Sequence, residues 1–192
     1  MLKYPILILS VAILAISCQS KKEITENHDQ HMTAPAQTEA DTVKKSLPKE
    51  THAMVGNAHI TIKYTAPVVK GRIIWGGLVP YNEVWVTGAH RATSFEIDKN
   101  FIIGNQNIPA GKYAIFTIPG TETWTFILNK NWDQHLADDY NASGDLLRIN
   151  VTPEKLEETQ ERLLYAIETI SATEGALQIS WEKIRITIPL KF

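Results

Sequence analysis

Residues Lys70–Gly88, KGRIIWGGLVPYNEVWVTG, hold two strand-like runs separated by two bends. The runs are Arg72–Trp75 and Glu83–Thr87. The pair Gly76-Gly77 gives the backbone freedom for a sharp turn or a close approach, and Pro80-Tyr81-Asn82 is a second turn signal. Rigid and aromatic residues gathered around two bends predict either a tightly specified corner or a binding surface.

Apolar side chains alternate with period two on both sides of this stretch, as they do in half-buried strands. The expected strands are Ala58–Tyr64, Thr93–Ile97, Phe101–Ile103, Lys112–Ile118, Thr123–Leu128, Leu147–Val151, Leu163–Ile167, and two runs, Leu177–Trp181 and Ile184–Leu190, around Glu182-Lys183. Residues 133–139 and 153–160 are expected to form short helices. About nine to ten short strands with one or two helices predict an all-β antiparallel sandwich, jelly-roll-like or barrel-like.

The N-terminal residues are typical of a lipoprotein signal peptide. Lys3 precedes the apolar run Ile6–Ile16, which is too short to span a bilayer of about 30 Å. Leu14–Cys18 resembles a bacterial lipobox, and this resemblance implies cleavage before Cys18 and acylation of that cysteine. An ordinary signal peptide with an accidental cysteine is the alternative. Cys18 is the only cysteine of the chain, so disulfides and cysteine metal ligands are excluded within it.

Composition then divides the chain into a signal peptide (1–17), a flexible tether from Cys18 (18–52) and one β-sandwich domain (53–192). The tether is rich in polar residues and contains Pro35 and Pro48. Within it, His28 and His31 form a candidate loose metal site, although scattered linker histidines are the simpler interpretation. A net charge of −2 gives no electrostatic case for nucleic acid.

No established catalytic signature occurs: G-x-S-x-G, H-E-x-x-H, a P-loop and G-x-G-x-x-G are all missing from the sequence. If residues 133–139 are helical, His135 and Asp139 lie on one helix face and can share a metal or a proton. His90 is the other candidate for catalysis or metal binding. Solvent-facing loop residues are the alternative for all three, and no cofactor is expected.

Aromatic residues at strand ends and turns suggest a platform for a ligand. Trp124 and Trp181, in contrast, lie on apolar strand faces and are expected in the core. Filling of corners is the alternative for the turn aromatics. The candidate ligand-binding residues are Trp75, Tyr81, Trp85, His90, Arg91, Asn129 and Trp132.

Four separated stretches in order carry a resemblance to a known family: KGRIIWGGLVPYNEVWVTGA, IPAGKYAIFTIPG, WTFILNKNWDQ and WEKIRITIPL. The chain resembles a bacterial family of secreted proteins and lipoproteins that is catalogued as a domain of unknown function, number 2911. The resemblance covers about Ile60–Leu190 and implies a single β-rich envelope domain without implying any chemistry. Two departures stand out: Val86 replaces the usual Arg, and His90-Arg91 replaces the usual Asn-Glu.

We therefore expect a lipid-anchored, extracytoplasmic protein of the cell envelope, in the outer membrane of a Gram-negative bacterium, that binds a glycan or a protein partner. The alternatives are a metal-dependent or hydrolytic enzyme using His90 and His135, and a structural component without a small ligand. A pocket joining His90 to His135 would favour the enzyme, and a flat exposed row of aromatic residues would favour binding.

Overall fold

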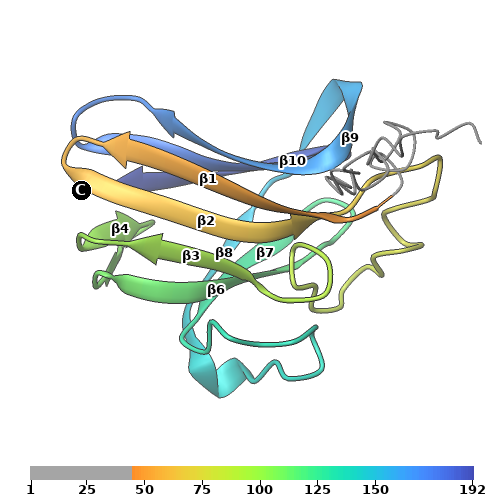
Figure 1. The fold of residues 1–192 in the computed structure, drawn as a ribbon, viewed down its shortest axis with the longest axis horizontal. Helices are drawn as coiled ribbons and strands as arrows, with labels where there is room; N and C mark the ends of the chain where they lie inside the picture. The colour runs from red at the N-terminus through yellow and green to blue at the C-terminus, as the bar shows by residue number, and fades with distance from the viewer. Residues whose placement is uncertain (1–44) are drawn as a thin grey trace, which may run out of the picture. The chain divides into compact units, whose positions relative to one another are not determined.

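Two antiparallel β-sheets face each other in the computed structural model, which describes residues 45–192 (Figure 1). The six-stranded sheet has the order β1 (Leu47–Val55), β2 (Ala58–Ala66), β3 (Thr93–Ile97), β6 (Gly111–Ile118), β7 (Trp124–Asn129) and β8 (Asp145–Val151). The four-stranded sheet has the order β5 (Gln106–Ile108), β4 (Phe101–Ile103), β10 (Glu174–Lys191) and β9 (Glu154–Thr169). The sheets do not close into a barrel, and the expectation of an all-β sandwich is confirmed.

The main core lies between the sheets because alternate residues of each strand point inward. Strand β2 buries Ile60 and Ile62 while His59 and Lys63 remain exposed. The opposing strand β10 buries the alternating residues Ile186, Ile188 and Leu190. The period-two pattern therefore identified the inward faces of these strands correctly.

Strands β6 and β7 are buried on both faces. Their outward residues Ala114, Phe116 and Ile127 form a second, smaller core with Val86 and Ala92. Two loops supply the cover over this outer face, one before β3 and one between β7 and β8, where Tyr140 packs edge-on against Phe116. Burial on both faces explains why Tyr113–Ile118 and Trp124–Leu128 are mostly buried rather than alternately exposed.

The two apolar runs expected at the C-terminus form one bulged strand, β10. Leu177, Ile179 and Trp181 are odd-numbered, whereas the residues that point inward later in the strand are even-numbered. The pairing of β10 with β9 changes register on both sides of Glu182, whose φ is 55°. A bulge shifts the alternation in this way.

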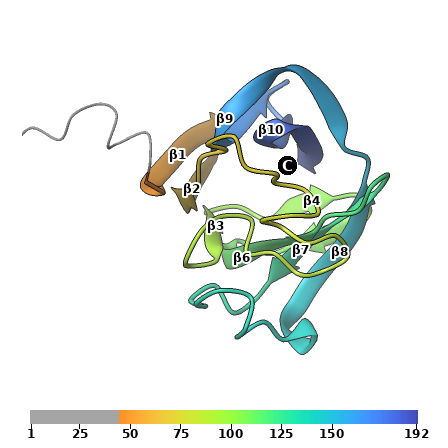
Figure 2. The same ribbon diagram turned by 90° about the vertical axis from the view of Figure 1, so that its right-hand side faces the viewer.

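Strands expected at Arg72–Trp75 and Glu83–Thr87 are wrong. Residues 67–92 connect β2 to β3 and contain only isolated bridges, such as Trp75 with Val79 and Trp85 with Thr117. Figure 2 shows this yellow connection crossing the end of the sandwich between the two layers. Turns and partly buried tryptophans, rather than ladder hydrogen bonds, hold it there.

Both expected helices are also wrong in position. Residues 133–139 form turns, and residues 154–160 belong to β9, where Glu154 and Lys155 pair with β10. Good helix formers in this segment suggested a helix, but pairing with β10 overrides propensity. The short helix within the described residues is the 3₁₀ turn Ala142–Gly144.

The described chain begins before the expected domain start. Residues 47–52, which composition placed in the tether, lie in β1 and pair with β2. Cys18, the signal peptide, and the candidate metal residues His28 and His31 lie outside the described residues. Within residues 45–192, no helix has the length and apolar character needed to cross a membrane.

Candidate functional site

Four of the five tryptophans pack together at the end of the sandwich crossed by the 67–92 connection. The Trp75 ring centroid lies 5.7 Å from Trp85, 4.7 Å from Trp124 and 5.8 Å from Trp181. Trp85 stacks on Trp181 at 5.6 Å. Trp75 and Trp85 are only partly buried but pack against the main core, so they do not form an exposed aromatic row.

The indole N–H groups of this cluster are not all satisfied. Trp85 Nε1 donates to the Gly88 carbonyl at 3.0 Å. Trp75 Nε1 and Trp181 Nε1 are buried and have no hydrogen-bond partner within the described part of the chain. Because a buried donor without an acceptor is costly, these two groups mark a place where an acceptor would be stabilising.

A pocket of about 270 Å³ opens beside the cluster, and we call it the loop pocket. The 67–92 connection, the 134–136 loop, β10 and the start of the described chain together form it. Its lining residues are Ser46, Pro67, Arg72, Leu78, Val79, Trp85, Val86, Gly88, Ala89, His90, Leu136 and Trp181.

The charge at the loop pocket is one-sided. Arg72 and His90 line it, and no Asp or Glu does. Two loop carbonyls hold Arg72: Nε donates to Val69 at 3.2 Å and Nη2 donates to Val68. Among residues 45–192, no carboxylate lies within ion-pair distance of this guanidinium, so its remaining N–H donors face solvent or a ligand.

Backbone pairing between two loops positions His90. Leu136 N donates to the His90 carbonyl at 2.8 Å, and Ala92 N donates to the Gln134 carbonyl at 3.0 Å. His90 and Leu136 both have positive φ, 68° and 57°. Non-glycine residues seldom adopt this conformation, which occurs preferentially where the surrounding structure imposes it, including at ligand sites.

A second pocket of about 340 Å³, the Trp132 pocket, lies over the edge of the six-stranded sheet. Its lining includes Arg91, Asp133, Glu50 and Lys63 in addition to Trp132. Arg91 pairs with Asp133, and Lys112 Nζ lies 3.9 Å from the Trp132 ring centroid. Charges of both signs therefore neutralise one another here, and a lysine already occupies one face of the exposed indole.

The structure separates the residues proposed as ligand contacts. Trp85 and His90 line the loop pocket, whereas Arg91 and Trp132 line the Trp132 pocket. Tyr81 is exposed and lies over Gly76, where an added Cβ would come within 2.9 Å of the ring. Trp75 is in the inner cluster, so the candidate ligand-binding residues do not line one common pocket.

Asn129 is a structural residue. Its side chain is fully buried, and Nδ2 donates to the Asn141 carbonyl at 3.0 Å and to Asp145 Oδ1 at 2.8 Å. Oδ1 accepts from Asn131 N at 2.9 Å and from Gln134 Nε2 at 3.2 Å. Both donors and both lone pairs are used, so no polar atom of Asn129 is left for a ligand.

The candidate metal residues do not assemble. Within the described residues, no group of three His, Cys, Asp or Glu side chains is placed to hold a metal ion, so His90, His135 and Asp139 do not form one. Asp139 Oδ2 instead accepts a hydrogen bond from His135 N at 3.1 Å and stabilises the turn that was expected to be a helix. Neither of the two pockets is lined by both His90 and His135.

A family model described as "Protein of unknown function (DUF2911)" matches residues 46–190. The chain belongs to this family. No match was found among the curated proteins or the solved structures. The predicted membership of this family is thereby confirmed, whereas its bacterial, secreted and lipid-anchored character stays a prediction. Of the residues that are expected from sequence to depart from the family's usual form, Val86 and His90 line the loop pocket, and Arg91 lines the Trp132 pocket.

Of the twelve residues that line the loop pocket, only Trp85 and His90 were identified from sequence as site residues. The residues that were missed include Arg72, Leu78, Leu136 and Trp181. Trp181 was correctly expected in the core, but its position beside a pocket depends on the bulge in β10. Arg72 gave a weak signal, since it is a cation directly before an apolar run and a glycine pair. Only the three-dimensional path of the connection places these residues together.

Proposed function

We propose that this chain is a lipid-anchored cell-envelope protein whose β-sandwich binds a ligand in the loop pocket. One observation carries the proposal. The pocket combines Arg72 and His90, without any acidic lining residue, with a wall containing Trp181, whose buried N–H has no partner. A concave, mostly apolar site with a few convergent polar groups is the usual form of a ligand site.

The envelope location rests on the N-terminal sequence. Cys18 follows a lipobox-like stretch, and acyl chains on that residue would hold the domain at a membrane. Metabolic labelling with a radioactive fatty acid should label the chain, and Cys18→Ser should abolish the label. Labelling that persists in this variant would contradict the anchor.

Ligand binding is tested by a thermal-shift screen of the full chain against neutral and acidic glycans, small organic acids and a panel of envelope proteins. A ligand at a hundred times its Kd stabilises by about 2.7 kcal/mol, enough to raise Tm by several degrees. We expect at least one compound to give such a shift.

Blocking variants locate the binding. Leu78→Trp and Ala89→Phe place larger side chains at the loop pocket and should remove the shift. Ile170→Trp makes a similar change at an exposed apolar residue between β9 and β10, and should leave the shift intact. A ligand that binds the blocked variants as tightly as the unchanged chain would place binding elsewhere and refute the proposal.

A further inference from the structure

We infer that the loop pocket takes a small organic carboxylate with an apolar body. This inference rests on the proposed function, because it names the ligand class of the same pocket. Three features of the pocket carry it: the apolar walls, the surplus of hydrogen-bond donors and the unopposed positive charge.

The walls favour an apolar body. Pro67, Leu78, Val79 and Leu136 line the pocket with Trp85 and Trp181. Leu78 and Leu136 are 48% and 38% exposed without a ligand, so covering them would remove apolar surface from water. A strongly hydroxylated sugar would gain little from these surfaces and would lose water from its hydroxyl groups.

The side-chain polar groups favour an acceptor over a donor. The unpaired indole N–H groups of Trp181 and Trp75 are buried, and Trp75 does not line the pocket, so they do not supply the donors that a ligand would meet there. Arg72 offers the donors that its two carbonyl contacts leave free. A carboxylate is an acceptor only, so it matches this set without leaving a donor of its own unpaired.

The charge pattern favours an anion. Arg72 has no carboxylate partner within residues 45–192, and no acidic residue lines the pocket. The Trp132 pocket provides the contrast, since Glu50 and Asp133 line it and Arg91 is already paired. Of the two pockets, only the loop pocket therefore presents an arginine available for bidentate pairing with a carboxylate.

The volume sets the size. About 270 Å³ corresponds to roughly nine water molecules at about 30 Å³ each. One aromatic ring or a short alkyl chain with a carboxyl group fits this space. Phenylacetate is a suitable probe, and phenylacetamide is its neutral counterpart of nearly equal shape.

The test is a titration of the full chain with each compound, in which binding is measured by tryptophan fluorescence and by calorimetry. Fluorescence is informative because Trp85 and Trp181 line the pocket. We expect phenylacetate to bind more tightly than phenylacetamide. Arg72→Gln should lower the affinity for phenylacetate about tenfold, as expected for loss of one charge-assisted contact, and should leave the affinity for phenylacetamide unchanged.

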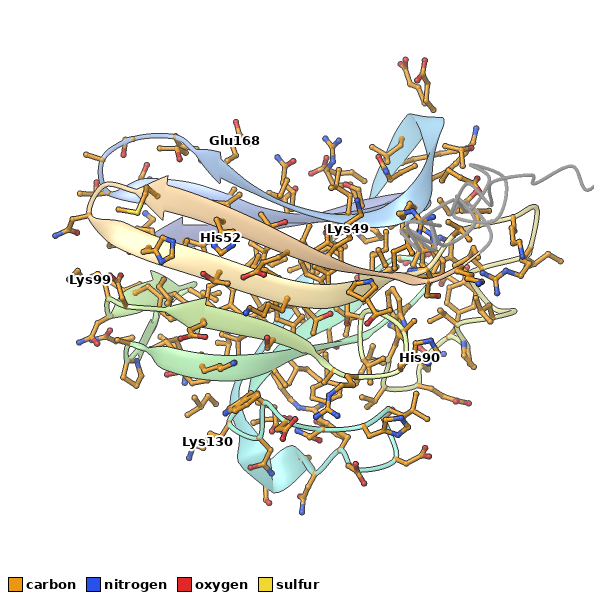
Figure 3. All side chains as sticks on the ribbon, viewed as in Figure 1. Lys49, His52, His90, Lys99, Lys130 and Glu168 are labelled. Atoms are coloured by element: carbon orange, nitrogen blue, oxygen red, sulfur yellow. The ribbon has the colours of Figure 1, made fainter. Side chains whose placement is uncertain are left out.

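A matched pair of variants at an exposed wall residue checks the role of charge. Leu78→Glu should lower the affinity for phenylacetate by charge repulsion, whereas Leu78→Gln should lower the affinity for both compounds equally. Lys99→Gln is the control for a general change of charge, since Lys99 and His90 lie at opposite ends of the sandwich (Figure 3). This control should change neither affinity.

The outcomes separate this inference from the proposed function. One outcome is that phenylacetate and phenylacetamide bind equally well and that Leu78→Trp abolishes the binding of both. This would overturn the inferred preference for a carboxylate but would leave the loop pocket as a ligand-binding site. Binding of a glycan or other neutral compound in place of phenylacetate would do the same. If no compound is sensitive to the blocking variants, both the inference and the proposed function fail.

Discussion

At the scale of single residues, one buried hydroxyl joins the four-stranded sheet to the connection that forms the loop pocket. Tyr165 of β9 donates to the Thr87 carbonyl at 2.7 Å, and its ring lies 4.7 Å from that of Tyr64. Thr93 Oγ1 donates to the same carbonyl at 3.0 Å. These bonds fix Thr87, whose φ of 51° turns the chain towards Gly88.

Tyr165→Phe should lower the free energy of unfolding by about 1–2 kcal/mol at neutral pH, because it removes a buried hydrogen bond and little volume. Denaturant unfolding measures this change. Tyr81→Phe removes the hydroxyl of an exposed tyrosine and should have almost no effect. Equal losses in the two variants would show that the Tyr165 bond contributes nothing specific.

The same residue gives a prediction for alkaline pH. Burial raises the pKa of Tyr165 well above its ordinary value of about 10. The unfolded chain then loses a proton above about pH 10 that the folded chain keeps, so stability must fall as pH rises through this range. The decline in unfolding free energy between pH 9 and 11 should be shallower in Tyr165→Phe, and an unchanged slope would contradict this.

Residue roles were the least accessible to sequence reasoning. Asn129 is the last residue of β7 and precedes a polar loop, a position where ligand contacts also occur. Its role depends on Gln134, Asn141 and Asp145, which lie 5, 12 and 16 residues further along the chain and are brought around its amide by the fold of the loop. Sequence gives the donors and acceptors of a side chain but not the partners that satisfy them.

At the scale of elements, β10 shows how a break in alternation can be interpreted. The change from odd to even inward residues places an extra residue near Glu182, and the structure has its register shifts there. In contrast, the path of β9 was not predictable from its own residues. Leu163 N donates to the Pro67 carbonyl, and Val69 N donates to the Glu161 carbonyl. At this point β9 therefore pairs with the 67–92 connection instead of with β10.

Substitutions at Glu182 test the bulge. Its φ of 55° disfavours side chains branched at Cβ, so Glu182→Val should lower the unfolding free energy by about 1–2 kcal/mol. Glu182→Gly should cost less, because glycine adopts positive φ freely, although it loses the 2.6 Å contact from Lys183 N. Equal or reversed stabilities in chemical unfolding would exclude strain at this position.

At the scale of the whole molecule, sequence predicted the fold class well but placed the N-terminal boundary of the domain poorly. The sandwich followed from the alternating runs, since nine of them independently required a buried face. Strand β1 was missed because the centre of LPKETHAMV, Lys49–His52, is polar: it lies at the edge of its sheet, where one neighbouring strand suffices. Charged edge strands of this kind also discourage pairing between molecules.

Truncation tests the boundary. A chain of residues 53–192 lacks most of β1 and the Thr51 Oγ1 bond to the Tyr165 carbonyl, whereas a chain of residues 45–192 keeps both. We expect the shorter chain to melt several degrees lower in a calorimetric scan, as a loss of about 1–2 kcal/mol would produce. Equal melting temperatures would show that β1 adds no stability.

The second core under the loops has an evolutionary consequence. Val86 belongs both to that core and to the wall of the loop pocket, so a mutation there would alter the shape of the pocket and the stability of the fold together. Three other lining residues are exposed, so their mutation should affect stability less: Arg72, Leu78 and Leu136. Divergence of ligand preference within the family should therefore begin at the exposed rim, and changes at Val86 should follow only in members that have accumulated compensating substitutions beneath the loops.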